Sequence, residues 1–394
     1  MRCDELRLST GIAEVDRVLG GGVVAGSVVL LAGEPGIGKS TLVLQLLQGV
    51  VRAGGSCVLV SGEESLAQTG LRAARLGIPL DGVRAASSTS LQAVIAASER
   101  ERPDVLVIDS IQTIEDAALE QPAGSVVQVR ESASALVRHA KSTGVAVILV
   151  GHVTKDGAVA GPKTLEHVVD AVVTLEGERG GGLRLLRAAK NRFGSCDETG
   201  VFTMSRHGLE AVGDASAMLL ADRRPGATGS VVFPGMEGSR PVLVEIQALV
   251  TGTKLPQPRR VAIGVDARRV TLLLGVLCKG EGMSFGTKDV FVAAAGGLAV
   301  REPAADLAMC LALFSGLEEV AISGDIIAIG EVGLAGEVRR VPAIDRRLTE
   351  AARLGFSTAI VPQHARVSRA DMKIVAVGHI DEALHACARK GFAA

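Results

Sequence analysis

Short apolar runs alternate with amphipathic segments through the first half of the chain. The apolar runs are rich in Val, Leu and Ile, as expected of strands buried on both faces. We predict strands at 27–32, 56–61, 105–109 and 145–150, and helices at 12–19, 41–47, 66–76, 90–101 and 125–142. This alternation favours an α/β fold in which helices cover a mostly parallel sheet.

The first predicted helix carries its own start and stop signals. Ser9 and Thr10 precede its apolar positions and are typical N-cap residues. The three glycines at 20–22 follow its last apolar residue and mark its end. Farther along, the apolar runs 171–175 and 183–189 flank a charged, Gly-rich turn, which predicts a hairpin.

The pattern loosens around 212–230, and we place a domain boundary there. We expect a first domain at 1–215, a linker at 216–229 and a second domain at 230–394. The second domain has a mixed pattern of strands and helices. We predict its strands near 242–249, 290–292, 326–329 and 359–361, and its helices near 270–278, 304–315, 343–354 and the C-terminus.

One stretch of the first domain carries a specific chemical signature. It reads G-x-x-x-x-G-K-S from Gly33 to Ser40, between a predicted strand and a predicted helix. Its glycines let successive backbone N–H groups face a phosphate, and the helix N-terminus adds partial positive charge. Lys39 can reach the β- and γ-phosphates, and Ser40 can hold Mg²⁺. We therefore predict a site for ATP and Mg²⁺ made by Gly33, Glu34, Pro35, Gly36, Ile37, Gly38, Lys39, Ser40 and Thr41.

Carboxylates follow two of the other predicted strands. Asp109 ends the strand at 105–109, about 70 residues after the phosphate loop, and suits a Mg²⁺ ligand that acts through water. Glu63 and Glu64 follow the strand at 56–61. Either could orient and deprotonate an attacking water, while the other serves the first turn of the next helix. The sequence does not separate them.

Two further segments carry cations. Lys190 and Arg192 lie in a segment predicted as a tight loop closing the hairpin, where they suit a neighbour's γ-phosphate, DNA phosphates or merely a solvated turn. His152, Lys155 and Lys163 lie in a glycine-containing loop that follows the predicted strand at 145–150. His152 could sense the γ-phosphate, or it could be only a satisfied polar residue.

Composition limits how this chain could hold a partner. Net charge is −1 and the 8 aromatic residues are all Phe, so a DNA grip would depend on charge and backbone contacts rather than on Trp or Tyr stacking. The 6 cysteines are scattered without a C-x-x-C pair, which indicates a reduced, cytoplasmic chain with neither disulfides nor a zinc site. We expect no signal peptide and no membrane span.

These motifs, in this order, resemble the RecA-like ATPases and, more closely, the bacterial RadA/Sms recombination proteins. The specific marks are the segments 9–11 and 16–22, the phosphate loop, and the segments 62–65, 151–157 and 190–194, the last of them Lys-Asn-Arg-Phe-Gly. The resemblance covers nearly the whole chain. It implies a homohexameric ring with ATP at the subunit interfaces, single-stranded DNA in the central channel, and a motor that drives branch migration of branched DNA alongside a RecA-type recombinase.

The resemblance also assigns roles to residues. Lys39, Ser40 and Asp109 would hold Mg-ATP, and Glu63 or Glu64 would be the base. Lys190 and Arg192 would act across the interface or on DNA, and Lys155 and Lys163 would sit on channel loops. The family normally begins with a four-cysteine zinc module. Here only Cys3 precedes the ATPase domain, so we expect no zinc in this chain and do not carry over that module's engagement of a partner helicase.

The second half resembles the Lon peptidase domain, most visibly at 330–338. A Lon-type peptidase needs a Ser nucleophile activated by a Lys. Ala304 and Asp345 stand at the two expected positions, so the resemblance implies a non-proteolytic, ring-forming α+β scaffold. The arginine pairs at 259–260, 268–269 and 339–340 are either basic patches for DNA or solvated surface.

Three rival functions follow from the same sequence. The chain could be a regulatory RecA-like ATPase that assembles partners without moving along DNA. It could also be an ATP-dependent protease, against which the missing Ser and Lys argue. The last rival is a strand-exchange recombinase that forms filaments, against which the Lon-like half argues.

Overall fold

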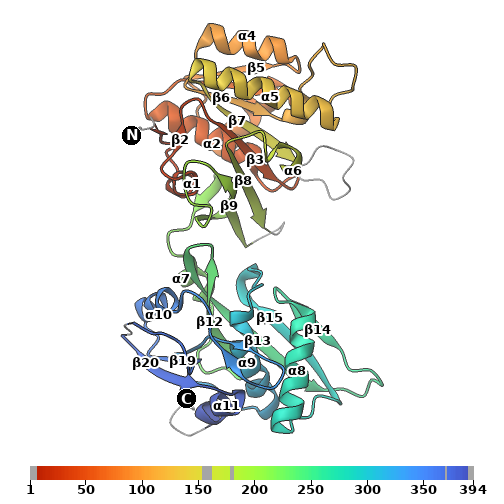
Figure 1. Cartoon of the computed structure of the whole chain (residues 1–394), viewed down its shortest axis with the longest axis vertical. Helices are drawn as coiled ribbons and strands as arrows, with labels where there is room; N and C mark the ends of the chain where they lie inside the picture. Colours follow the sequence, from red (N-terminus) through yellow and green to blue (C-terminus); the bar gives the residue numbers. More distant parts are fainter. Residues whose placement is uncertain (1–6, 153–161, 178–181, 369–370, 389–394) are drawn as a thin grey trace. The chain divides into compact units, whose positions relative to one another are not determined.

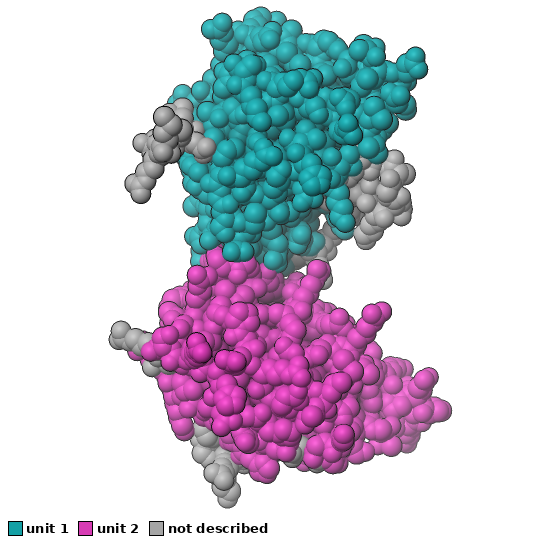
Figure 2. Space-filling model, viewed as in Figure 1, with its two compact units in different colours: residues 1–213 teal, residues 214–394 magenta. Residues whose placement is uncertain are grey.

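Two separate β-sheets organise the chain, one in each of two units, Met1–Gly213 and Asp214–Ala394 (Figures 1 and 2). The computed structural model describes residues 7–152, 162–177, 182–368 and 371–388. None of the helices in these ranges is both long and apolar enough to cross a membrane.

The sheet of the first unit is parallel through most of its width. Its parallel strands, in spatial order, are β5 (Val83–Ser87), β4 (Cys57–Ser61), β6 (Val105–Asp109), β7 (Ala146–His152), β3 (Val28–Gly33) and β8 (Ala171–Gly177). Antiparallel strands β9 (Leu183–Asn191), β10 (Thr199–Ser205) and β11 (Gly208–Ala211) extend it beyond β8. A small separate ribbon pairs β1 (Arg7–Leu8) with β2 (Val23–Val24).

Helices enclose this sheet on both faces. They are α1 (Ala13–Leu19), α2 (Lys39–Arg52), α3 (Leu66–Leu76), α4 (Leu91–Glu101), α5 (Val126–Thr143) and the short α6 (Pro162–Leu165), with a 3₁₀ turn at Ile111–Thr113. Alternate residues of β3 enter opposite cores: Val29 and Leu31 pack with residues of α2, and Val28 and Leu30 with residues of α5. The predicted α/β fold with a mostly parallel sheet is confirmed.

The start of the first helix differs from the prediction. Ile12 is its N-cap residue, and its side chain makes no cap hydrogen bond. The Ser9 and Thr10 hydroxyls instead donate to the carboxylate of Asp16, in the first turn of the helix, at 2.6 and 2.7 Å. These hydroxyls therefore tie the preceding loop to the helix rather than capping it.

A mixed sheet forms the second unit. Its strands, in spatial order, are β14 (Arg260–Ile263), β15 (Lys288–Ala294), β13 (Arg240–Gly252), β12 (Ser230–Glu237), β16 (Ile326–Ala328), β19 (Thr358–Pro362) and β20 (Lys373–Val377). The helices are α7 (Ala215–Leu220), α8 (Ala267–Glu281), α9 (Asp306–Glu318), α10 (Ile344–Arg353) and α11 (Ile380–Ala388), with 3₁₀ turns at Ala295–Gly297 and Pro303–Ala305. β17 (Glu331–Val332) and β18 (Val338–Arg339) form a separate hairpin.

Helix α7 lies where the sequence predicts the linker 216–229. It packs on β13, and its Ser216 hydroxyl is buried. That hydroxyl accepts from the Leu243 N–H at 3.1 Å and donates to Glu350 at 2.7 Å. The segment is thus attached to the second unit through part of its length.

Candidate nucleotide-binding site

The ends of four parallel strands bring the predicted site residues of the first unit together. In register, Gly33 of β3 lies opposite His152 of β7, and Asp109 of β6 lies opposite Ser61 of β4. Glu63 lies two residues after the end of β4. Because parallel strands end at one edge of a sheet, the phosphate loop and both carboxylates share this edge.

The phosphate loop depends on its glycines. A Cβ at Gly33 would lie 2.6 Å from the carbonyl oxygen of Leu175, and Gly38 has φ +119°, which few residues other than glycine adopt. Ile37 is buried and anchors the loop in the core, while 34–36 are exposed. Helix α2 starts at Lys39, so Ser40 and Thr41 lie in its first turn, where N–H groups face outward from the helix end.

Lys39 is buried, with 4% of its surface exposed. Its ammonium group lies 2.8 Å from the Gly33 carbonyl oxygen, 3.0 Å from that of Glu34 and 3.1 Å from Nδ1 of His152. Burial lowers the pKa of Lys39, and the nearby charges of Asp109 and Glu63 oppose this shift. The side chain is therefore held at the loop by acceptors that phosphate oxygens can replace.

Glu63 is placed differently from its neighbour Glu64. Its Oε1 accepts a hydrogen bond from the Ser110 hydroxyl and lies 3.0 Å from Nε2 of His152. Burial alone would raise the pKa of Glu63, but the hydrogen bonds from Ser110 and His152 and the charge of Lys39 outweigh it and lower the pKa. Glu63 is therefore ionised and able to accept a proton.

Glu64 makes a different set of contacts. Its carboxylate forms an ion pair with Arg72 of α3. Its backbone forms a tight turn with Ser61, whose hydroxyl donates to the Glu64 carbonyl at 2.8 Å and accepts from its N–H at 3.1 Å. Of the two glutamates that the sequence leaves open, the contacts favour Glu63 as the base.

Ser40 and Asp109 fit a magnesium ion. Burial raises the pKa of Asp109, and a hydrogen bond from Ser40 opposes that shift. Glu63 raises the pKa of Asp109 further, because two carboxylates then face one small region. A hydroxyl and a carboxylate are hard oxygen ligands of the kind that Mg²⁺ prefers, and a divalent cation would relieve the repulsion between the carboxylates.

Comparison with known proteins identifies the family. A family model described as an AAA domain matches residues 3–158, and one described as subunit ChlI of Mg-chelatase matches residues 267–365. DNA repair protein RadA of Pseudomonas aeruginosa is 49% identical over 382 residues, which is 96% of this chain and 84% of that protein. The chain belongs to the RadA family of DNA repair proteins. The RadA proteins of Escherichia coli (47% identity, 96% of this chain, 82% of that protein) and Bacillus subtilis (44%, 97% and 84%) agree.

The Lys190–Gly194 segment of this RadA family member is not the predicted tight loop of the hairpin. Lys190 lies within β9, and the segment continues toward β10. The Lys190 ammonium donates to the carbonyl oxygens of Glu166 and Val169 at 2.6 and 2.8 Å. Burial, followed by the charge of Arg192, lowers its pKa. Lys190 is thus used in part to hold its own unit together.

Arg192 lies beyond the end of β9 and is more accessible. Its side chain is 51% exposed, and its guanidinium pairs with Asp170 at 3.0 Å. Asp170 also accepts from the N–H of Val28, the first residue of β3, at 3.1 Å. Arg192 therefore lies at the opposite edge of the sheet from the phosphate loop. It lines a hollow of about 380 Å³ together with Lys141 and Phe193.

The remaining predicted sensor and loop residues have three different outcomes. His152 joins the site through Lys39 and Glu63, and Lys163 is exposed on α6. Lys155 lies outside the described residues. Sequence reasoning missed Ser110, Arg72 and Asp170. Of these three, only Ser110 could have been found from the sequence, because it directly follows the predicted site residue Asp109.

The second unit of this RadA family member contains the positions where a Lon-type peptidase would hold its Ser and Lys. Ala304 is buried in a 3₁₀ turn, and Asp345 of α10 accepts from the N–H and hydroxyl of Ser368 at 2.9 and 2.8 Å. Arg347, two residues later in α10, is fully buried and donates to Glu302 and to the Pro234 carbonyl oxygen. These positions hold a methyl group and a carboxylate in place of a nucleophile and an amine.

One member of each predicted arginine pair is engaged within the unit. Arg260 donates to the carbonyl oxygens of Phe285, Lys288 and Arg259, and Arg269 pairs with Asp306. Arg339 pairs with Glu331 and Glu337. Because these three arginines already have partners within the unit, each pair has fewer free side chains with which to bind DNA phosphates.

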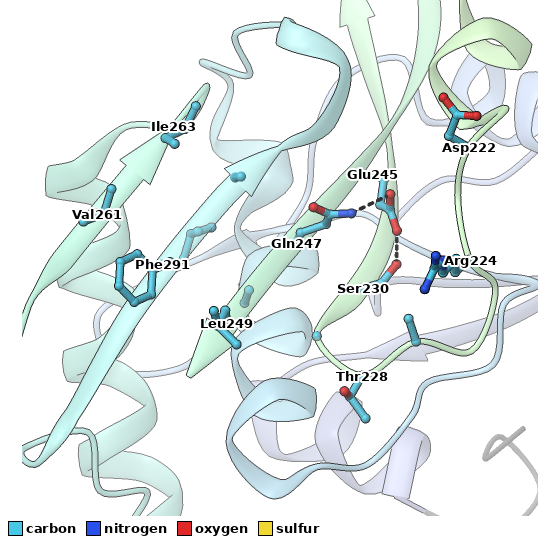
Figure 3. Close-up of a pocket in the computed structure, with 15 residues that line it drawn as sticks. Asp222, Arg224, Thr228, Ser230, Glu245, Gln247, Leu249, Val261, Ile263 and Phe291 are labelled. Atoms are coloured by element: carbon cyan, nitrogen blue, oxygen red, sulfur yellow. Dashed lines mark hydrogen bonds between the residues drawn. The ribbon is translucent and has the colours of Figure 1, made fainter. Parts of the chain in front are cut away.

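An open cavity of about 440 Å³ lies on the sheet of the second unit (Figure 3). One side is polar: Glu245 accepts hydrogen bonds from Ser230 and Gln247. The other side is apolar, with Leu249 of β13, Phe291 of β15, and Val261 and Ile263 of β14. Leu249 and Val261 both lie opposite Phe291 in register, so they share one face of the sheet.

Substituting each glutamate in turn tests which of the two is the base. We expect Glu63→Gln to lower the ATP hydrolysis rate by about 10²–10⁴-fold, the contribution typical of a general base. Glu64→Gln weakens only the pair with Arg72 and should keep the rate within about tenfold, as expected from the modest free energy of a partly exposed ion pair. Both variants should bind ATP. Steady-state hydrolysis and fluorescent-nucleotide binding measure the two effects, and a larger loss for Glu64→Gln would reverse the assignment.

Proposed function

We propose that this chain is a DNA-dependent ATPase of homologous recombination and DNA repair. The observation that carries the proposal is the meeting of Lys39, Asp109 and Glu63 at one sheet edge behind a glycine-rich phosphate loop. Membership of the RadA family, whose members are named DNA repair proteins, supplies the biological setting. The bacterial relatives are consistent with a cytoplasmic site of action.

Each residue of the site has a distinct proposed role. Backbone N–H groups of the phosphate loop and Lys39 would bind the phosphates, and Ser40 and Asp109 would hold Mg²⁺. The bound ion would neutralise negative charge on the phosphates. Glu63 would accept the proton of the attacking water, and its lowered pKa keeps it ionised for this step.

The motor that we propose is a homohexameric ring that translocates on single-stranded DNA and drives branch migration, with a RecA-type recombinase as its partner. Lys155 and Lys163 would contact DNA in the central channel. His152 would respond to the γ-phosphate, since it contacts Lys39 directly. We do not propose a protease, because Ala304 and Asp345 supply neither a nucleophile nor an amine.

The position of Arg192 supports action between subunits. β3 spans six residues from Val28 to Gly33, so its ends lie about 16 Å apart at about 3.3 Å per residue. Arg192 is tied through Asp170 to the far end of that strand and does not reach its own phosphate loop. A nucleotide that Arg192 contacts would therefore be bound to another copy.

The second unit offers a surface for ring contacts. Leu249, Val261 and Ile263 expose 60%, 39% and 62% of their surface. β14 is an edge strand of the sheet. Contiguous exposed apolar side chains of this kind mark protein–protein contacts, and the proposed ring requires such a contact between copies. We therefore propose that a second copy covers this face.

The experiment that tests the proposed function is ATP hydrolysis with and without single-stranded DNA. We expect a measurable basal rate that DNA increases several-fold. Lys39→Ala should abolish both rates, because it removes the phosphate contact. A rate indifferent to DNA would favour the regulatory ATPase instead, and normal turnover in Lys39→Ala would overturn the site itself.

Mixing variants tests whether Arg192 acts in trans. Lys39→Ala and Arg192→Ala rings should each be inactive, since loss of a trans cation typically costs about 10³-fold or more. If subunits are mixed equally, about one interface in four combines an intact Lys39 with an intact neighbouring Arg192 (one half times one half), so about a quarter of the wild-type rate should return.

A matched mixture provides the control. Lys39→Ala mixed with Glu63→Gln should stay inactive, because both residues belong to the same subunit's site. Inactivity of the Arg192 mixture as well would place Arg192 in cis or on DNA. If Arg192 acts on DNA, Arg192→Ala would lose DNA stimulation rather than basal hydrolysis. Lys190→Ala, measured alongside, should also impair hydrolysis or movement while leaving ATP binding nearly intact.

Introducing a charge on the apolar face tests the ring contact. Leu249→Asp and Ile263→Asp should each dissociate the hexamer, because a carboxylate would be desolvated in the interface. Leu71→Asp is the control, since Leu71 is 72% exposed on α3, outside this face. Light scattering after size-exclusion chromatography measures the mass. Intact hexamers in both test variants would exclude this face as the interface.

A further inference from the structure

His152 lies between two residues of the proposed machinery. Its Nδ1 is 3.1 Å from the ammonium nitrogen of Lys39, and its Nε2 is 3.0 Å from Oε1 of Glu63. The three side chains come from α2, the end of β7 and the segment after β4. One imidazole thus bridges the phosphate-binding cation and the candidate base.

The direction of both hydrogen bonds follows from Lys39. An ammonium group has three protons and accepts none. Three acceptors surround it: the carbonyl oxygens of Gly33 and Glu34, and Nδ1 of His152. Nδ1 therefore accepts, which leaves the imidazole proton on Nε2. That N–H donates to Oε1 of Glu63, a carboxylate oxygen that can only accept.

The same oxygen receives a second hydrogen bond, from the Ser110 hydroxyl. Both hydrogen bonds to the Glu63 carboxylate among the described residues thus fall on Oε1. They fix the rotation of the carboxylate and leave Oε2 to take up a proton. Because a general base needs its accepting oxygen aimed at the water, holding the other oxygen is a way to aim it.

We propose that His152, as the neutral tautomer protonated on Nε2, is a positioning residue for Glu63 in the ATP hydrolysis proposed above. It also connects the base to nucleotide binding. When Lys39 turns to a phosphate, it gives up some of its three present acceptors. Nδ1 of His152 is one of these, so occupancy of the phosphate loop changes the partner of the imidazole that holds Glu63.

Two substitutions at one position test this inference. His152→Leu removes both hydrogen bonds. His152→Gln keeps an oxygen that accepts from Lys39 and an N–H that donates to Glu63. Since hydrogen bonds to charged groups are the stronger ones, His152→Leu should lower kcat by about 10–100-fold. The KM for ATP should change by less than about threefold, because uniform binding is unaffected.

Rescue by His152→Gln is the decisive result. This variant should restore kcat to within about fivefold of the wild type, because the retained hydrogen bond to Glu63 still aims the base. His167→Leu, at an exposed histidine of the same unit, should leave kcat unchanged. Wild-type kcat in His152→Leu, or a His152→Gln variant no better than His152→Leu, would overturn the inference. Neither result touches the proposed function, which fails separately if the wild type shows no hydrolysis sensitive to Lys39→Ala.

Discussion

The parallel register of β3, β7, β6 and β4 is the constraint on which the candidate site depends. Gly33 pairs with His152, and Asp109 pairs with Ser61, so residues far apart in sequence end at one edge. Side chains alternate between two buried faces, and a one-residue slip would exchange the two cores. The hydrophobic pattern that stabilises the sheet therefore also fixes which side chains meet at the phosphate loop.

Burial makes the charges of this site depend on one another. A buried ammonium or carboxylate is costly unless it is paired, and here burial lowers the pKa of Lys39 and raises that of Asp109. The negative charges of Asp109 and Glu63 oppose the shift of Lys39, whereas Glu63 adds to the shift of Asp109. The site thus favours an arriving cation near the carboxylates and an anion near Lys39, which is the charge distribution of a magnesium–nucleotide complex.

The sequence predicted those parts of the site that depend on local chain geometry. The phosphate loop and Asp109 could be found because strand, turn and helix are adjacent in the chain. Glu63 and Glu64 could not be separated, since their difference arises from Ser110, His152 and Arg72, which only folding brings near. The same reason explains the errors. Ser9 and Thr10 bind a side chain beyond the helix start, and Lys190 binds carbonyl oxygens of the segment after α6.

In the second unit, the positions predicted to match the Ser and Lys of a Lon-type peptidase lie beside contacts that stabilise the fold. Next to the positions of Ala304 and Asp345, the fully buried Arg347 is held by Glu302 and by carbonyl oxygens. Removing one partner of such a pair leaves an uncompensated charge and typically costs about 3–5 kcal/mol. Neither Ala304 nor Asp345 can act as a nucleophile or an amine base. The contacts of Arg347 beside them therefore maintain the fold. A unit maintained in this way, with an exposed apolar sheet face, is suited to binding other protein surfaces rather than to cleaving them.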